Sequence, residues 1–364
     1  MVEATNRPKT PSKPATTPLP PTHKARYANA MNPIAISQGD PAGIGPELIA
    51  ASWILRGMAR LEPFVAVGSE RVFDQAARHR GLDVPVRAVG SLEEAAAMFD
   101  RALPVLDLGD AEYTPGQPTD QGALLALQSL DAATQLTVAG ETSALVTAPV
   151  SKSRLASVGF NHPGQTEFVG QASGVAPDDA VMMLAGPSLK VVPMTVHVPL
   201  HAVPGLITAE LITRRSAITA RALARDFGIA NPRLAVAGLN PHAGEDGRMG
   251  HEDQSYIAPA VAALKAAGIA ARGPLPADTM FHAQARSTYD VAICMYHDQA
   301  LIPLKALDFD DGVNVTLGLP IVRTSPDHGT AFGIAGSRQA RPGAMIAAIR
   351  LAGECAARRA GHLA

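Results

Sequence analysis

The chain has 364 residues, of which 47% are hydrophobic and 18% are charged, and its formal net charge at pH 7 is −2. This length and composition predict a compact soluble protein of about two domains, and the missing basic surplus together with only 4% aromatic residues argues against a nucleic-acid partner. No apolar run approaches the ~20 residues that span a bilayer, and the two cysteines, Cys294 and Cys355, are too few for a disulfide framework, so we expect a cytoplasmic protein that does not enter a membrane.

The N-terminal residues 1–30 are dominated by Pro, Thr, Lys and Ala and show no apolar period. Such a segment cannot offset the entropy of its ordering by burying apolar groups, which predicts a disordered tail. A targeting segment is the alternative, although transit peptides are rich in Arg and Ser and this segment is not.

After the tail, short apolar or β-branched runs alternate with Ala-rich helical stretches. The alternation predicts an α/β fold in which helices cover a mostly parallel sheet, arranged as two lobes with a cleft between them. The predicted strands are 33–36, 63–67, 86–89, 144–147, 181–184, 190–195, 234–237 and 291–295, and the predicted helices are 46–60, 71–80, 122–139, 210–227, 256–267 and 342–359.

A glycine-rich segment, Gly39-Asp-Pro-Ala-Gly-Ile-Gly-Pro-Glu47, joins the first strand to the first helix. Its glycines permit a tight turn, Pro46 suits the first helical turn, and Glu47 favours the positive end of the helix. The segment is not a dinucleotide-binding fingerprint, because Leu48 stands where the third glycine of that motif is required.

Three histidines, His197, His242 and His297, follow apolar, strand-like runs. Imidazole is a common ligand of divalent transition metals, and three protein ligands with one open position are typical of a catalytic metal site. The spacing is too long for a local metal-binding motif, so the fold would have to gather the three side chains. A loop histidine without a metal is the alternative for each one alone.

Six motifs occur in the order in which they occur in the 4-hydroxythreonine-4-phosphate dehydrogenase family, and the resemblance extends from about residue 33 to residue 352. They are the Gly39–Glu47 segment, Thr147-Ala-Pro-Val-x-Lys152, Asn240-Pro-His-Ala-Gly-Glu245, Gly273-Pro-Leu-Pro-Ala-Asp-Thr279, Tyr296-His-Asp-Gln299 and Gly312-Val-Asn-Val-Thr-Leu-Gly318. The chain therefore resembles this family.

The resemblance implies the fold of the isocitrate and isopropylmalate dehydrogenases, with two α/β/α domains and the active site in the interdomain cleft at the interface of a homodimer. On this fold we expect a larger domain formed by residues 31–147 and 305–364, and a second domain, 148–304, that carries the metal ligands and dimer contacts. The implied reaction is NAD- or NADP-linked oxidation of 4-phosphohydroxy-L-threonine at C3, in the route to pyridoxal phosphate. The resulting 3-oxo acid is primed to lose carbon dioxide.

The family's functional residues can be carried over onto matching positions. The metal ligands, for zinc, magnesium or cobalt, fall on the same three histidines, His197, His242 and His297. Asp278 and Asp298 are candidate carboxylates for proton transfer or for holding a ligand, with ordinary loop aspartates as the alternative. The remaining candidates are Gln165, Thr166, Lys305, Asn314 and Arg323 for the substrate and Asp327, His328, Gly329 and Thr330 for the nicotinamide cofactor.

One position departs from the family pattern. The family usually has Gly-His-Thr-Glu where this chain has Gly164-Gln165-Thr166-Glu167. An amide can donate and accept hydrogen bonds, but it cannot become cationic or shuttle a proton at neutral pH. Four-carbon acid-sugar phosphates and aromatic dihydrodiols therefore stay open as alternative substrates.

Two other classes of function use similar residues. A metallohydrolase could use the three histidines to activate water, and a non-catalytic metabolite-binding protein could share the two-lobed shape. Hydrolysis of a phosphate ester without cofactor reduction would indicate the first, and a purified protein without metal would indicate the second.

Overall fold

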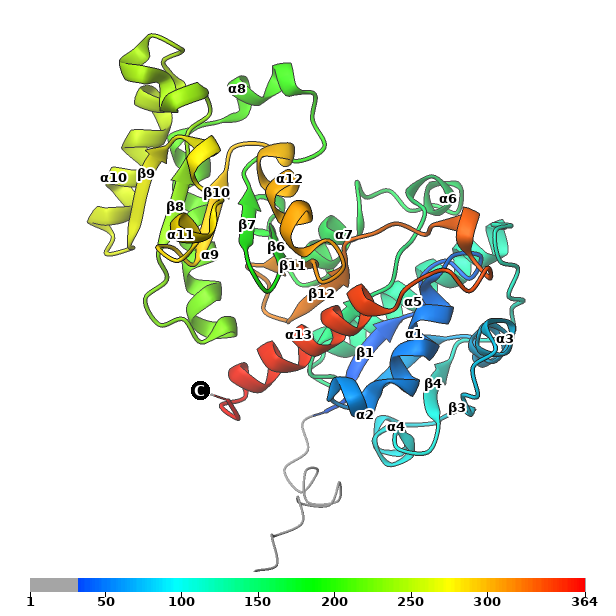
Figure 1. Cartoon of the computed structure of the whole chain (residues 1–364). Helices are drawn as coiled ribbons and strands as arrows, with labels where there is room; N and C mark the ends of the chain where they lie inside the picture. Colours follow the sequence, from blue (N-terminus) through cyan, green and yellow to red (C-terminus); the bar gives the residue numbers. More distant parts are fainter. Residues whose placement is uncertain (1–31, 364) are drawn as a thin grey trace, which may run out of the picture. The chain divides into compact units, whose positions relative to one another are not determined.

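The computed structural model describes residues 32–363, so the disordered tail predicted for residues 1–30 lies outside the described residues. Helices and strands alternate along the described chain, and the predicted α/β class is confirmed (Figure 1). The elements up to residue 172 are β1 (Ile34–Ser37), α1 (Gly45–Ile54), α2 (Arg56–Ala59), β2 (Phe64–Gly68), α3 (Glu70–Arg80), β3 (Val86–Ala88), α4 (Leu92–Met98), β4 (Leu103–Asp107), α5 (Asp120–Val138), β5 (Leu145–Thr147), α6 (Lys152–Ser157) and α7 (Gln165–Ala172).

The later elements begin with the antiparallel pair β6 and β7 and end with the long helix α13. They are β6 (Val181–Ala185), β7 (Lys190–Pro193), α8 (Val203–Leu206), α9 (Ala209–Phe227), β8 (Leu234–Ala237), the turn η4 (Pro241–Gly247), the π-helix η5 (Asp253–Ile257), α10 (Ala258–Ala266), β9 (Ala271–Leu275), η6 (Ala277–Thr279), α11 (Ala283–Arg286), β10 (Val291–Cys294), α12 (His297–Asp308), β11 (Val313–Leu317), β12 (Arg323–Pro326) and α13 (Gly343–Arg359), with short 3₁₀ turns at η2 (Pro177–Asp179), η3 (Leu200–Ala202) and η7 (Phe332–Ile334). Every strand and helix predicted from the sequence is present, whereas the strands β4, β9, β11 and β12 are not among the predicted ones.

Within residues 32–363 the strands form one twelve-stranded sheet in the order β3-β4-β2-β1-β5-β12-β11-β6-β7-β10-β8-β9. Most neighbours are parallel, as predicted, but β11 is antiparallel to both β6 and β12, and β6 is antiparallel to β7. The first series of strands therefore lies on one side of β12 and β11, and the second series lies on the other. The division into two domains, 31–147 with 305–364 and 148–304, stays a prediction.

The strands carry much of the core, and in β1, β2, β5, β8, β10 and β12 every residue is buried. In β1 and β2 all residues are buried, as expected for parallel strands that helices cover on both faces. The helices have local signals at their ends. Helix α9, for example, begins after Thr208, whose side chain accepts a hydrogen bond from the Leu211 N–H, and it ends at Gly228, which has a φ of 70°.

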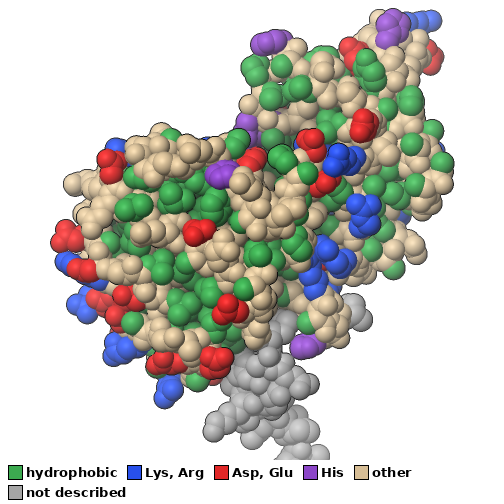
Figure 2. Space-filling view, turned by 180° about the vertical axis from the view of Figure 1, so that it is seen from behind, with side chains coloured by type: hydrophobic (Ala, Val, Ile, Leu, Met, Phe, Trp, Pro, Cys, Tyr) green, Lys and Arg blue, Asp and Glu red, His purple; other side chains and the backbone are tan. Residues whose placement is uncertain are grey.

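The surface reflects the nearly balanced charge of the chain. On the face seen in Figure 2, basic side chains lie among acidic ones and among scattered apolar side chains. None of the helices within residues 32–363 is long and apolar enough to cross a membrane.

Candidate functional site

A cavity of about 480 Å³ collects most of the polar side chains that the sequence singles out. Helix α7, strands β11 and β12, the loop after β7 and the start of α12 all contribute to its wall. Its lining includes the candidates Gln165, Thr166, His197, His297, Asn314, Arg323, Asp327, His328 and Gly329.

Arg323, the first residue of β12, is only 3% exposed. Its Nη1 donates to Thr166 Oγ1 (3.3 Å) and Thr316 Oγ1 (3.0 Å), and its Nη2 donates to Thr147 Oγ1 (2.6 Å). Among residues 32–363 no carboxylate forms an ion pair with this guanidinium, and its Nε has no hydrogen-bond partner. Burial lowers the pKa of Arg323 to about 10, against the opposing charge of Glu167. A buried cation without a counter-ion favours an anionic ligand in the cavity.

Two buried oxygen atoms in the same cavity have no donor. Asn314 Oδ1 and Gln165 Oε1 lack a hydrogen-bond partner, while Gln165 Nε2 donates to the Ala148 carbonyl at 3.3 Å. A buried polar atom without a partner costs free energy, so such atoms in a cavity are suited to a ligand. Both oxygens can accept a hydrogen bond from a hydroxyl or amino group.

Lys305 lies on α12, and its Nζ is 2.8 Å from Oδ2 of Asp327 in the loop after β12. Asp327 lines the cavity, whereas Lys305 is not among its lining residues. The two side chains are 39% and 22% exposed, and an ion pair of such exposure contributes little to stability. The ammonium group can therefore exchange this carboxylate for an anionic ligand at small cost.

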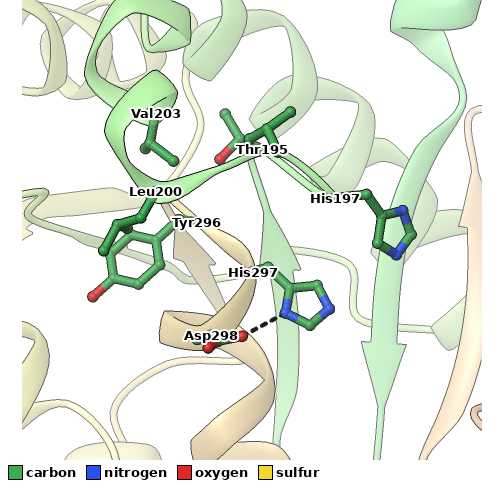
Figure 3. Close-up of a pocket in the computed structure, with 8 residues that line it drawn as sticks. Thr195, His197, Leu200, Val203, Tyr296, His297 and Asp298 are labelled. Carbon is green, nitrogen blue, oxygen red and sulfur yellow. Dashed lines mark hydrogen bonds and ion pairs between the residues drawn. The ribbon is translucent and has the colours of Figure 1, made fainter.

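His197 and His297 lie side by side, with ring centroids 5.7 Å apart (Figure 3). His297 is the first residue of α12, and its Nδ1 is 2.6 Å from Asp298 Oδ1. An ionised carboxylate only accepts hydrogen bonds, so in a neutral imidazole this contact places the proton on Nδ1 and the lone pair on Nε2, the nitrogen that could then bind a metal. Burial lowers the pKa of His197, and the charges of Lys152 and His297 lower it further, which favours the neutral form that binds metals.

A second cavity, of about 340 Å³, lies against the same two imidazoles. Its other walls are formed mainly by the segment after β7, including Val198, Leu200 and Val203, and by Tyr296 (Figure 3). Leu200 is 68% exposed. The histidine pair thus borders an apolar surface that faces solvent in the single chain.

Two predicted residues lie away from this pair. His242 is exposed in the turn η4, and Asp278 is exposed in η6, and neither lines either cavity. Within residues 32–363, no group of three or more His, Cys, Asp or Glu side chains is arranged to hold a metal ion. A single chain brings two of the three predicted ligands together, and the complete trio stays a prediction.

The predicted cofactor loop packs against the glycine-rich segment before α1. The Ile44 N–H donates to the Thr330 carbonyl at 3.0 Å, and a Cβ on Gly43 would lie 2.9 Å from the same oxygen. His328 Nε2 is buried without a partner, in a loop that lines the larger cavity with Asp327 and Gly329. The close approach explains why a glycine stands at position 43.

Sequence reasoning missed two of the three threonines that hold Arg323. Thr147 lay inside a recognised motif but was given no role, and Thr316 lay inside another. Lys152 and Glu167 also line the larger cavity and had no predicted role. Their position in the family-like motifs is the only sequence signal that could have marked them.

Comparisons with known proteins show the family to which the chain belongs. The family model described as pyridoxal phosphate biosynthetic protein PdxA matches residues 60–352. A 4-hydroxythreonine-4-phosphate dehydrogenase of Erythrobacter litoralis is 58% identical over 330 residues, which cover 91% of this chain and 98% of the relative.

Solved structures show the same relationship. A 4-hydroxythreonine-4-phosphate dehydrogenase from Klebsiella pneumoniae has a TM-score of 0.80 and 38% identity, covering 90% of this chain and 98% of that one. A terephthalate 1,2-cis-dihydrodiol dehydrogenase from Burkholderia xenovorans has a TM-score of 0.61 and 28% identity, covering 87% and 96%. The resemblance found in the motifs is thus confirmed, and the chain belongs to the family of the pyridoxal phosphate biosynthetic protein PdxA.

Proposed function

We propose that this protein is a metal-dependent, NAD- or NADP-linked 4-hydroxythreonine-4-phosphate dehydrogenase. It oxidises 4-phosphohydroxy-L-threonine at C3 to a 3-oxo acid that decarboxylates to 3-amino-2-oxopropyl phosphate, on the route to pyridoxal phosphate. The observation that carries the proposal is the buried charge of Arg323, which has no counter-ion and lies in one cavity with two unpartnered acceptor oxygens. A substrate with anionic ends and with hydroxyl and amino donors satisfies all three groups. The names of the relatives support the same activity.

The substrate contacts divide by charge. Arg323 and the Thr166 hydroxyl bind an anionic end of the substrate, and Lys305 joins them when it leaves Asp327. Gln165 Oε1 and Asn314 Oδ1 accept hydrogen bonds from the hydroxyl or amino group and so orient the carbon that is oxidised.

A divalent metal fits the histidine pair. The contact of His297 Nδ1 with Asp298 turns Nε2 into the nitrogen for a metal, and the lowered pKa of His197 favours its neutral form. Imidazole ligands favour a transition metal such as zinc over magnesium. When bound, such a metal supplies Lewis-acid stabilisation of the substrate oxygen. His197 and His297 hold it from this side, and His242 is the third ligand in the proposal.

The proposed active unit is a homodimer. His242 lies outside the cavities that contain the other two histidines, and the surface beside them exposes the apolar side chains of Val198 and Leu200. A second copy that covers this surface would bury apolar area and bring its own His242 to the pair. Sedimentation of the purified protein should show a dimer.

The reaction requires a proton acceptor and later a proton donor. The hydroxyl proton goes to a base, and a bound nicotinamide would accept the hydride from C3 with its electron pair. After CO₂ departs, the electron pair left at C2 takes up a proton. Asp298 holds the His297 ring, so its contribution to catalysis is positioning. Asp278 stays the candidate base, although it lies outside the cavity in the single chain.

The nicotinamide cofactor, NAD or NADP, is assigned to the loop formed by Asp327, His328, Gly329 and Thr330. His328 Nε2 is buried without a partner, and the loop borders the substrate cavity, so these residues would hold the cofactor, which would supply the hydride acceptor. The proposed location of the enzyme is the cytoplasm.

A cofactor-reduction assay tests the proposal. Purified protein, supplied with zinc and with NAD or NADP, should reduce the cofactor with 4-phosphohydroxy-L-threonine and should do so far faster than with erythronate 4-phosphate, threonate 4-phosphate or an aromatic cis-dihydrodiol. The dihydrodiol is included because one of the related structures is a dihydrodiol dehydrogenase and because Gln165 replaces the family's usual histidine. Preference for one of the alternative substrates would transfer the assignment to it. Phosphate release without cofactor reduction would replace the dehydrogenase by a metallohydrolase.

A further inference from the structure

The turn that carries His242 has an uncommon backbone conformation. Five consecutive residues, His242 to Asp246, have φ values of 53°, 53°, 80°, 42° and 56°, and only Gly244 among them is a glycine. Left-handed backbone costs a residue with a Cβ atom roughly 1–2 kcal/mol. A run of this kind persists only where the surrounding structure imposes it.

The carboxylate of Asp253 provides this restraint. Asp253 is fully buried, its Oδ1 accepts from the Leu239 N–H at 2.9 Å, and its Oδ2 accepts from the Asn240 N–H at 3.2 Å and from Asn240 Nδ2 at 3.0 Å. Asn240 Nδ2 also donates to Glu252 Oε2 at 2.8 Å. The two residues that lead into the turn are therefore fixed by three hydrogen bonds to one side chain.

The same carboxylate packs directly against the segment that leads into the turn and against the middle of the turn. A Cβ on Gly238 would lie 2.7 Å from Asp253 Oδ1, and a Cβ on Gly244 would lie 3.3 Å from Asp253 Oδ2. Among residues 32–363, no cation pairs with Asp253, so the partners of this buried carboxylate group are N–H groups alone. A buried carboxylate group is costly unless its hydrogen bonds are made, and apolar packing alone would not require one at this position.

The His242 ring itself is exposed, and no hydrogen bond or ion pair within the described residues holds it. The backbone of the turn consequently sets the direction of its Cα–Cβ bond, and with it the region that the imidazole can reach. We propose that Asp253, acting through Asn240, is a positioning residue that holds the left-handed turn and so fixes the direction in which His242 presents its imidazole to a metal ion. The inference rests on the proposed function for the assignment of His242 as a ligand.

The test compares Asp253→Asn with Asp246→Asn in the full-length protein. The first variant keeps the size of the side chain but turns one acceptor into an NH₂ group that faces the donors of Asn240. The second removes an exposed carboxylate of the same turn, and Asn tolerates left-handed backbone as well as Asp does. Asn240→Ala is a milder variant that removes only the side-chain bonds, in case Asp253→Asn does not fold.

Three measurements are made on each variant: hydrogen exchange of residues 241–247 in the metal-free protein, zinc affinity by chelator competition, and the visible absorption of the cobalt-loaded protein. In Asp253→Asn, exchange of the turn should rise at least about tenfold, zinc affinity should fall about 10- to 100-fold, and the cobalt band should shift. Asn240→Ala should show smaller changes in the same direction, and Asp246→Asn should match the wild type.

Unchanged exchange in Asp253→Asn and Asn240→Ala would overturn the inference, because the turn would then be held by other contacts. Faster exchange with unchanged zinc affinity and an unchanged cobalt band would overturn it as well, because the turn would not set the ligand's direction. If the wild-type protein binds no zinc or cobalt, the proposed metal site fails, and the positioning role fails with it. If the wild-type protein binds the metal and the variants are unaffected, only the positioning role of Asp253 is refuted, and the proposed metal site stands.

Discussion

Arg323 is the residue of the site whose side chain is held most firmly. Its three threonine partners fix the plane of the guanidinium, and burial leaves its charge without a counter-ion in the free protein. Because the pKa of Arg323 is lowered only to about 10, the group is still cationic at neutral pH. In the proposed function, a substrate anion pairs with this charge, and the cost in stability of the free protein is retained for binding.

Arg323→Met should therefore separate stability from activity. The variant should be at least as stable as the wild type in urea denaturation, because it removes an uncompensated buried charge. Its transition-state binding, calculated from kcat/KM, should weaken by about 3 kcal/mol or more. Arg323→Lys keeps the charge but cannot reach all three hydroxyl groups, so it should recover only part of the activity. A loss of stability by Arg323→Met that matches its loss of activity would show that the residue is structural.

Gln165 is the residue at which this chain departs from its family. Its Oε1 has no partner, which indicates that it accepts a hydrogen bond from a hydroxyl or amino group of the substrate. Gln165→Leu should cost about 1–3 kcal/mol in kcat/KM, and Gln165→His should be tolerated, because a neutral imidazole also offers an acceptor. Loss of turnover in Gln165→His with full turnover in Gln165→Leu would mean that the residue selects substrates by size.

Helices α9 and α13 are joined at Asp226, the last but one residue of α9. Its carboxylate accepts from Arg225 Nε (2.7 Å) and from Arg359 Nε (2.7 Å), and each guanidinium adds a second bond through Nη2. Burial alone would raise the pKa of Asp226, but the hydrogen bonds from Arg359 and Arg225 outweigh it and hold the pKa below its ordinary value. The stabilisation is therefore present above the ordinary aspartate pKa and is lost as the pH falls through the lowered one.

Arg359→Met should lower the free energy of unfolding by about 2 kcal/mol at neutral pH, because it leaves Asp226 with one of its two cations. The difference from the wild type should shrink as the pH falls through the lowered pKa of Asp226. Arg71→Met is the control, since it breaks exposed ion pairs with Asp110 and Glu112 and should cost less than about 1 kcal/mol. Urea denaturation across acid and neutral pH measures both, and equal losses in the two variants would contradict the assigned role of Asp226.

The strands that are not among the predicted ones show the limits of prediction from apolar patterns. Strand β12 reads Arg-Thr-Ser-Pro, which has no apolar run, yet all four residues are buried. Tertiary partners make this possible, since Arg323 bonds to three threonines and Thr324 Oγ1 donates to the Ala348 carbonyl at 2.9 Å. Strand β4 contains Pro104, a residue that disfavours a strand lying between two others.

The residues of the site also divide into those that a local sequence pattern predicts and those that it does not. His197 and His297 could be found from their places after apolar strands, whereas Arg323 was found only through the family resemblance. Its partner Thr147 is 176 positions away, and nothing local marks a threonine for such a contact. The left-handed turn at His242 was also not predicted, because it depends on the buried Asp253 rather than on a glycine at each position.

At the scale of the whole described chain, β11 and β12 join the two series of strands into one sheet. Strand β5 pairs with β1 on one side and β12 on the other, and β6 pairs with β7 and β11. Until β11 and β12 are made, β5 and β6 are therefore open edges of two unfinished sheets, and open edges invite pairing with other chains.

During synthesis β11 and β12, which pair with β6 and β5, emerge late, since β12 begins at Arg323 in a chain of 364 residues. Such long-range pairing slows folding and lengthens the time for which the edges are exposed. The strand that supplies the guanidinium to the site is thus also the strand that closes the sheet, so a nascent chain that stops short of it lacks the binding group and keeps an aggregation-prone edge.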